Sequence, residues 1–235
     1  KMNGKTEVRI QTSILNKMEK RILVAMANRM PSWITSDNLT VVGVIGALTT
    51  GVGYILSSWN LNFLWLASFG LILNWFGDSL DGTLARVRNA QRPIYGFYID
   101  HNIDGLTITI MCIGAGLSPM IKFSTAMLIL VGYLLLSIFT YINAYLKGEF
   151  RISYGNLGPT EFRLIVIIIN TMFIYFPFKD MYLHIMKYEV EVYDAIGFGI
   201  AILLFFIFLI SFFVFLRKYK QVDPPRWVDN HNNSN

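Results

Sequence analysis

The chain has 235 residues, of which 54% are hydrophobic and only 15% are charged. This composition is too apolar for an ordinary soluble domain, and it predicts an all-α integral membrane protein. The single cysteine, Cys112, leaves no disulfide framework, and the net charge of +5 is distributed, as shown below, in a way that speaks against a nucleic-acid partner.

Residues Val8 to Met30 have the pattern of an amphipathic helix, which Pro31 ends. Apolar residues recur at intervals of three and four, and lysines and arginines occupy many of the other positions. A basic helix with an apolar stripe, placed before the first membrane span, is expected to lie in the membrane interface. A helix that packs only against protein would show the same stripe, so this alternative stays open.

The stretch from Trp33 to Thr40 leads into the first long apolar segment. Asp37 and Asn38 stand at its start, where a short polar side chain can accept hydrogen bonds from the free amides of a helix N-terminus. Capping is therefore one interpretation of these residues. Ligand binding is the other, and it rests on a resemblance described below.

Six apolar segments follow, each close to the roughly 20 residues that a bilayer-crossing helix needs. They cover about 39–57, 61–87, 97–117, 120–146, 162–178 and 193–216. Six spans place both termini on one side of the membrane, and all but three of the 20 lysines and arginines fall on that side. Because positive charge marks the cytoplasmic side, we expect both termini in the cytoplasm.

Four aspartates stand where the second and third apolar segments meet, and they are the only acidic residues between Asp37 and Glu149: Asp78, Asp81, Asp100 and Asp104. Spacings of three and four put each pair on one face of its helix, and the short turn between the helices would bring the pairs together. Carboxylates beside membrane spans are costly to desolvate and indicate function. Together they need a cation, and paired Mg²⁺ or Mn²⁺ ions, which take oxygen ligands, serve phosphoryl transfer. Ordinary salt bridges to the basic residues of the turn are the alternative: Arg86, Arg88 and Arg92.

This stretch reads D, two residues, DG, two residues, AR, nine residues, G, three residues, D, three residues, D. It resembles the signature of the CDP-alcohol phosphotransferase family, in which the long gap is more often eight residues. The extra residue falls in the turn. We therefore divide the chain into a cytoplasmic amphipathic segment (1–38), a six-helix transmembrane catalytic domain (39–217) and a polar cytoplasmic tail (218–235).

The resemblance implies transfer of a substituted phosphate group from a CDP-alcohol to a hydroxyl, with release of CMP. By analogy with the family, Asp78, Asp81 and Asp100 hold two divalent cations, Mg²⁺ or Mn²⁺. Asp104 is the general base on the acceptor hydroxyl and also lies within the metal-binding group.

The resemblance also implies a set of residues that hold the CDP moiety, two of them in the segment before the first span: Asp37, Thr40, Gly82, Ala85, Arg86 and Gly96. Where the family usually has Pro-Asn, this chain has Ser36-Asp37. Arg151 and Arg163 are candidate contacts to the acceptor, and their alternative is an ordinary positive-inside role. His101 is expected to point away from the pocket.

The resemblance further implies a homodimer in which one substrate is a lipid, acting in phospholipid biosynthesis. We expect CDP-diacylglycerol as the donor, and a CDP-choline or CDP-ethanolamine donor with a diacylglycerol-like acceptor is the alternative. The expected location is a bacterial inner membrane, with the active site and both termini facing the cytoplasm. A cation transporter is the competing function, although such proteins usually place their ion sites near the midplane, on broken helices.

Overall fold

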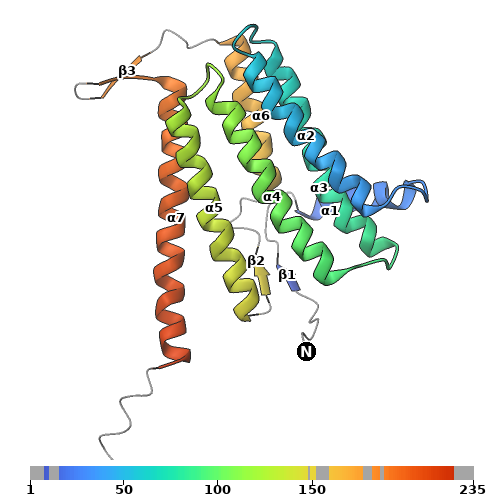
Figure 1. Cartoon of the computed structure of the whole chain (residues 1–235). Coiled ribbons are helices and arrows are strands. Elements are labelled where there is room, and N and C mark those ends of the chain that lie inside the picture. The colour runs from blue at the N-terminus through green and yellow to red at the C-terminus, as the bar shows by residue number, and fades with distance from the viewer. Residues whose placement is uncertain are drawn as a thin grey trace, which may run out of the picture.

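The structure is a computed structural model, and it describes residues 8–10, 16–147, 149–151, 159–176, 182–185 and 188–224. Within these residues the chain forms a helical bundle with four short strands (Figure 1). The helices are α1 (Asn16–Arg29), α2 (Ser36–Leu56), α3 (Phe63–Val87), α4 (Pro93–Gly116), α5 (Phe123–Lys147), α6 (Pro159–Tyr175) and α7 (Val192–Val222).

The six helices from α2 to α7 match the six predicted segments in order and approximate position. Four of them, α2, α3, α5 and α7, are long and apolar enough to cross a membrane, which confirms an all-α integral membrane protein. Helices α4 and α6 do not meet this criterion of length and hydropathy. Helix α6 has only 17 residues, and α4 carries Asp100 and Asp104 in its first half.

The predicted N-terminal helix is wrong at its start. Val8–Ile10 form strand β1, which pairs in parallel with β2 (Glu149–Arg151). The sequence Val-Arg-Ile alternates β-branched and polar side chains, a pattern that suits a strand better than a helix. Residues 11–15 lie outside the described residues, and the helix itself is present from Asn16.

The far ends of the bundle also differ in detail from the prediction. Strands β3 (Tyr182–Ile185) and β4 (Tyr188–Glu191) form an antiparallel pair between α6 and α7. Helix α7 continues six residues past the predicted end of the last span, through the basic run Arg217–Lys220, to Val222. Residues 225–235 of the predicted tail lie outside the described residues.

Helix α3 is the centre of the arrangement and contacts α1, α2 and α6, while α4 packs between α2 and α5, and α7 packs on α5. The backbones of α2 and α3 approach very closely. A Cβ atom added at Gly77 would lie 2.6 Å from the Cα of Gly43, and one added at Gly46 would lie 2.8 Å from the Cα of Asn74. Only glycine allows this approach, which fixes the turn of α3 that precedes the first site aspartate.

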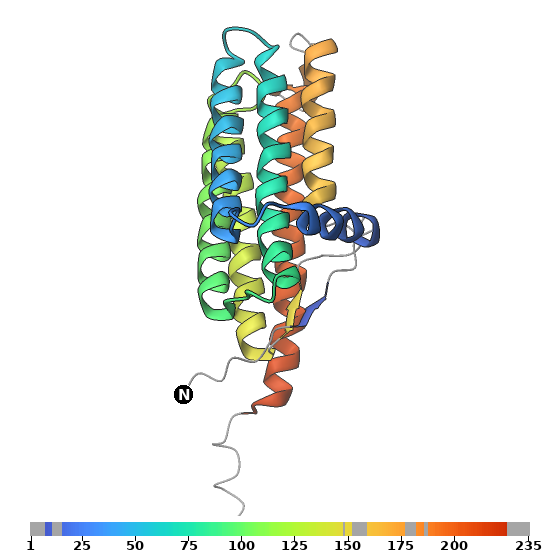
Figure 2. The same ribbon diagram turned by 90° about the vertical axis from the view of Figure 1, so that its right-hand side faces the viewer.

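Helix α1 lies across the bundle, almost perpendicular to the long helices (Figure 2). Leu23 and Ala27 are buried against Leu80 and Leu84 of α3. On its other side α1 exposes apolar side chains, among them Met18 at 59%. The helix therefore both packs on protein and presents an apolar surface outwards.

The turn between α3 and α4 has a defined geometry. Asn89 adopts the left-handed conformation, with φ at 53°. The amide of Ala90 donates to the carbonyl of Ala85 and the amide of Asn89 to that of Arg86, which is the Schellman pattern of a helix end. Pro93 then opens α4 at the first helical position, where its missing amide costs nothing. This turn brings the aspartate-bearing ends of the two helices side by side.

Candidate active site

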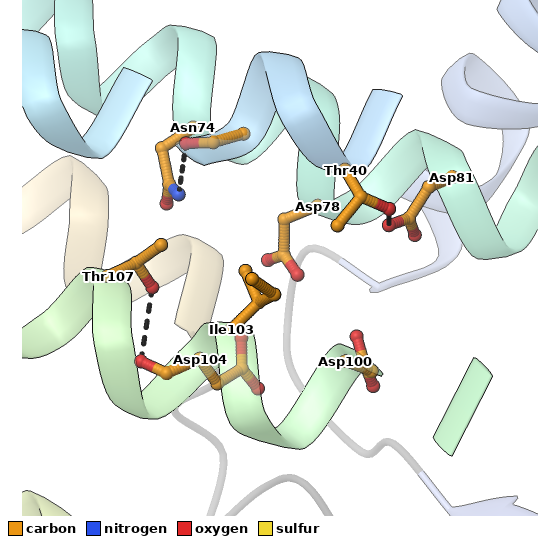
Figure 3. Close-up of a pocket in the computed structure, with 9 residues that line it drawn as sticks. Thr40, Asn74, Asp78, Asp81, Asp100, Ile103, Asp104 and Thr107 are labelled. Atoms are coloured by element: carbon orange, nitrogen blue, oxygen red, sulfur yellow. Dashed lines mark hydrogen bonds between the residues drawn. The ribbon is translucent and has the colours of Figure 1, made fainter. Parts of the chain in front are cut away.

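A small pocket lies between α2, α3 and α4, towards the end of the bundle where α3 turns into α4 (Figure 3). All four predicted aspartates line it. The other lining residues come from the same three helices: Thr40, Gly43, Asn74, Ile103 and Thr107. The structure therefore brings the two aspartate pairs together, as the helix spacing predicts.

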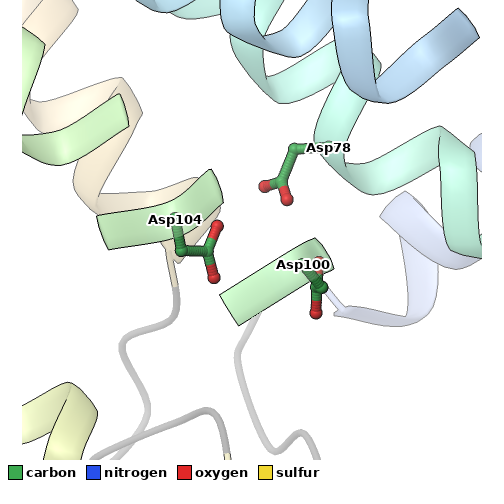
Figure 4. A group of neighbouring side chains, drawn as sticks. All are labelled: Asp78, Asp100 and Asp104. Atoms are coloured by element: carbon green, nitrogen blue, oxygen red, sulfur yellow. The ribbon is translucent and has the colours of Figure 1, made fainter. Parts of the chain in front are cut away.

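Three of the carboxylates form a close group. Asp78 of α3 and Asp100 and Asp104 of α4 each offer an oxygen atom within 4.8 Å of the other two, and all three are half-buried. Figure 4 shows them on the two facing helices. Oxygen atoms at this separation, from half-buried carboxylates, form a donor set that suits a hard divalent cation.

Asp81 lines the same pocket but lies outside the close group. Its Oδ2 atom accepts a hydrogen bond of 2.7 Å from the hydroxyl of Thr40, and Figure 3 shows its side chain turned towards that residue. Ser36 donates to the backbone carbonyl of Asp81 at 2.9 Å. These hydrogen bonds join the start of α2 to the turn of α3 that carries Asp81. The metal-ligand role of Asp81 stays a prediction.

Arg163, on α6, contacts the aspartate group through Asp78. Its Nη2 atom donates to Oδ2 of Asp78 at 2.8 Å and to Oδ1 of Asn74 at 3.0 Å. The two side chains of the ion pair are 18% and 29% exposed, so the pair is largely shielded from water. Arg163, predicted as an acceptor contact, thus lies directly against a predicted metal ligand.

Asn74 is a site residue that the sequence did not single out. It is 4% exposed, and its amide donates to the carbonyl of Gly43 at 3.0 Å while its oxygen accepts from Arg163. The available signal was its position, a buried amide four residues before Asp78 and on the same face of the helix.

The residues predicted to hold the CDP moiety surround the outer part of the motif. The Arg86 side chain is exposed, folds back over Gly82 and donates to Thr83 at 2.9 Å. Gly96 is open, and a Cβ atom there would meet nothing within 4 Å. Packing therefore gives no reason for glycine at 96, whereas a closely approaching ligand would.

The start of α2 shows the capping role that its sequence left open, and the ligand-binding role stays a prediction. Thr35 and Asn38 form a reciprocal capping box, with hydrogen bonds of 3.2 and 2.9 Å. Asp37 instead forms an ion pair with Arg92, just before α4. Both of these side chains are 52% exposed, so a ligand can compete for either of them.

Two further positions considered in the sequence are not among the residues that line the pocket. Arg151 belongs to β2, and its side chain lies outside what the structure describes. His101 packs between the rings of Phe97 and Tyr141, with ring centroids at 3.9 and 4.2 Å. It packs against α5 and is not a lining residue, as predicted, although its Nδ1 atom lies 3.8 Å from Oδ2 of Asp100.

Comparison with known proteins supports the sequence resemblance. A family model described as CDP-alcohol phosphatidyltransferase matches residues 28–217. This range contains every residue that lines the pocket, and it confirms the family predicted from the aspartate motif. A search of curated proteins found no match.

Proposed function

The chain belongs to the CDP-alcohol phosphatidyltransferase family, and on this premise we propose a metal-dependent transfer from CDP-diacylglycerol to the hydroxyl of an acceptor alcohol, with release of CMP. The observation that carries the proposal is the close group of Asp78, Asp100 and Asp104, contributed by two helices and facing Arg163. A group of this kind at the end of membrane helices suits a reaction between a lipid and a soluble molecule.

We assign the aspartates by combining the family pattern with this geometry. Asp78, Asp81 and Asp100 would hold two Mg²⁺ or Mn²⁺ ions, which neutralise pyrophosphate charge and stabilise the charge that develops on departing CMP. Asp104 lies one helical turn after Asp100, further from the turn that joins α3 and α4. We assign it the proton of the acceptor hydroxyl, while it also remains within reach of the metal site.

The bond changes follow from these roles. The acceptor oxygen attacks the phosphorus that carries the donor's alcohol group, and the bond from that phosphorus to the oxygen of CMP breaks. Asp104 takes the acceptor proton. Arg86 and Gly82 on α3, with Thr40 and Asp37 on α2, would hold the CDP moiety. The exposed fork of Arg86 suits a phosphate.

The distribution of basic side chains bears on the acceptor and does not decide the donor. The last span has no lysine or arginine before Arg217, so in the described bundle Arg163 is the basic residue seen at the aspartate group. This pattern weighs mildly against an acceptor that carries its own phosphate. A CDP-choline or CDP-ethanolamine donor with a diacylglycerol-like acceptor is the alternative assignment.

We further propose that α4 and α6 also cross the membrane, giving six spans. The C-terminal end of α7, with its basic run, lies at the same end of the bundle as the turn between α3 and α4 (Figure 1). By the positive-inside rule this end faces the cytoplasm, which supplies nucleotides and Mg²⁺. The membrane would be a bacterial inner membrane, and the assembly a homodimer.

The test is a panel of CDP-linked donors and alcohols, given to the purified protein with Mn²⁺ or with EDTA and read by product mass spectrometry and CMP release. We expect one donor class to yield CMP and a transferred product, and only when Mn²⁺ is present. Cation flux in proteoliposomes without CMP release from any donor would instead identify a transporter.

A further inference from the structure

Glu19, in the first turn of α1, is a buried carboxylate in a helix that lies on the outside of the bundle. It is 9% exposed. One atom, Oε1, accepts a hydrogen bond of 2.8 Å from the indole of Trp75 on α3 and one of 2.7 Å from the hydroxyl of Thr160 on α6. Burying a carboxylate is unfavourable unless it is hydrogen-bonded, and here the bonds join three helices at one atom.

The two donors are close in sequence to the ion pair at the active site. Trp75 precedes Asp78 by three residues in α3, and Thr160 precedes Arg163 by three residues in α6. Residues three apart lie on neighbouring parts of one helix face. Glu19 therefore holds the turn of α6 that carries Arg163 against the turn of α3 that carries Asp78.

Other contacts also attach α1 and α6 to the bundle. The guanidinium of Arg88 donates to the carbonyls of Met30 at 3.0 Å and Pro31 at 2.8 Å, which secures the far end of α1. Deeper in the bundle, Asn170 of α6 donates to Ser68 of α3 at 3.1 Å. The contact that Glu19 adds is specific to the first turn of α6.

We propose that Glu19 is a positioning residue, which keeps the guanidinium of Arg163 on Asp78. It thereby limits the affinity of that carboxylate for a divalent cation. The inference rests on the proposed function. When the bonds from Trp75 and Thr160 are lost, the first turn of α6 is released and Arg163 moves off Asp78. Metal then binds more tightly, because a competing cation has left, while turnover falls because Arg163 is no longer in place.

The experiment compares Glu19→Met with Glu19→Gln in the full-length protein. Both remove the charge and keep the length, but only glutamine keeps an oxygen that accepts from both donors. We measure the Kd for Mn²⁺ by calorimetry, kcat and KM for the CDP-alcohol, and thermal stability. A net hydrogen bond contributes about 1 kcal/mol, which is about fivefold in an equilibrium constant, and so the methionine variant should bind Mn²⁺ roughly fivefold more tightly and turn over more slowly. The glutamine variant should stay close to the unmodified protein.

A second variant keeps the inference testable if methionine at 19 prevents folding. Thr160→Val removes one donor on α6 without touching Glu19, and it should shift the Mn²⁺ affinity and kcat in the same directions by a smaller factor. In an Arg163→Gln background, Glu19→Met should have no further effect on the Mn²⁺ affinity, because the competing guanidinium is already gone.

The outcomes separate this inference from the function on which it rests. Equal Mn²⁺ affinity and kcat in the methionine and glutamine variants, with an active unmodified protein, overturn the positioning role alone. A loss of thermal stability with unchanged Mn²⁺ affinity has the same meaning, since it describes a structural contact. An unmodified protein that neither binds Mn²⁺ nor releases CMP overturns the proposed function and this inference with it.

Discussion

Replacing Arg163 with glutamine should make the protein strongly dependent on divalent cations for stability. The guanidinium contacts Asp78 at 2.8 Å and Asn74 at 3.0 Å, and its removal leaves close carboxylates without that positive charge. Removing one partner of a buried ion pair costs about 3–5 kcal/mol. Because the side chains here are 18% and 29% exposed, we expect roughly 2–3 kcal/mol after allowance for solvent screening.

The assay is thermal unfolding of the purified protein in detergent, first with EDTA and then with Mn²⁺. For a chain of this size a loss of 2–3 kcal/mol corresponds to a fall in Tm of roughly 5–10 °C. Mn²⁺ should recover most of this loss, since a ligand that binds only the folded state stabilises it. Arg217→Gln is the matched control, because it makes the same chemical change at an exposed position on α7.

A double-mutant cycle decides whether the ion pair is the cause. Arg163→Gln in an Asp78→Asn background should cost much less than in the unmodified protein, because the unbalanced carboxylate has been removed. Equal falls in Tm for Arg163→Gln and Arg217→Gln would refute the reasoning. Strict additivity with Asp78→Asn would refute it as well.

Four further variants test the rest of the site and the helix packing beside it. Arg86→Lys keeps the charge but loses the planar fork, so the KM for the CDP-alcohol should rise, and unchanged donor kinetics would leave Arg86 as a positive-inside residue. Asp104→Asn should lower kcat by roughly 10²- to 10⁴-fold, the range of general acid–base catalysis, with near-normal Mn²⁺ affinity in calorimetry. Asp81→Asn should instead lose Mn²⁺ and donor binding together, and an equal loss of metal in both variants would make Asp104 a ligand. Gly77→Ala would bring a Cβ atom to 2.6 Å from the Cα of Gly43, so it should lower stability by about 1–3 kcal/mol, measured as Tm; an unchanged Tm would contradict the close approach of α2 and α3.

The helices and the position of the site could be predicted from the sequence because both depend on local patterns. Apolar runs of about 20 residues define spans, and aspartates three and four residues apart must share a helix face. The register of α2 against α3 could not be predicted in this way, because it comes from contacts between distant residues such as Gly43 and Gly77.

The finer arrangement of the site depends on side chains that are far apart in the sequence. Arg163 meets Asp78 across 85 positions, and Thr160 meets Glu19 across 141, so no local pattern records either contact. Asp81 is three residues after Asp78 and on the same helix face, yet it turns to the hydroxyl of Thr40. Like-charged carboxylates repel one another. Asp81 turns away from the other three because the fold places a hydrogen-bond donor of α2 beside it.

The crossing of α1 over the bundle has a consequence for how a lipid substrate is presented. The bond between Glu19 and Trp75 holds α1 level with the turn of α3 that leads to Asp78, and α1 exposes Met18 and Ile22 outwards. On our prediction that α1 lies in the membrane interface, the carboxylates would sit at the depth where a lipid's own phosphate rests. For a lipid donor the relevant concentration is therefore its mole fraction in the bilayer, and diluting it with inert lipid should slow the reaction even when the total amount in the tube is constant.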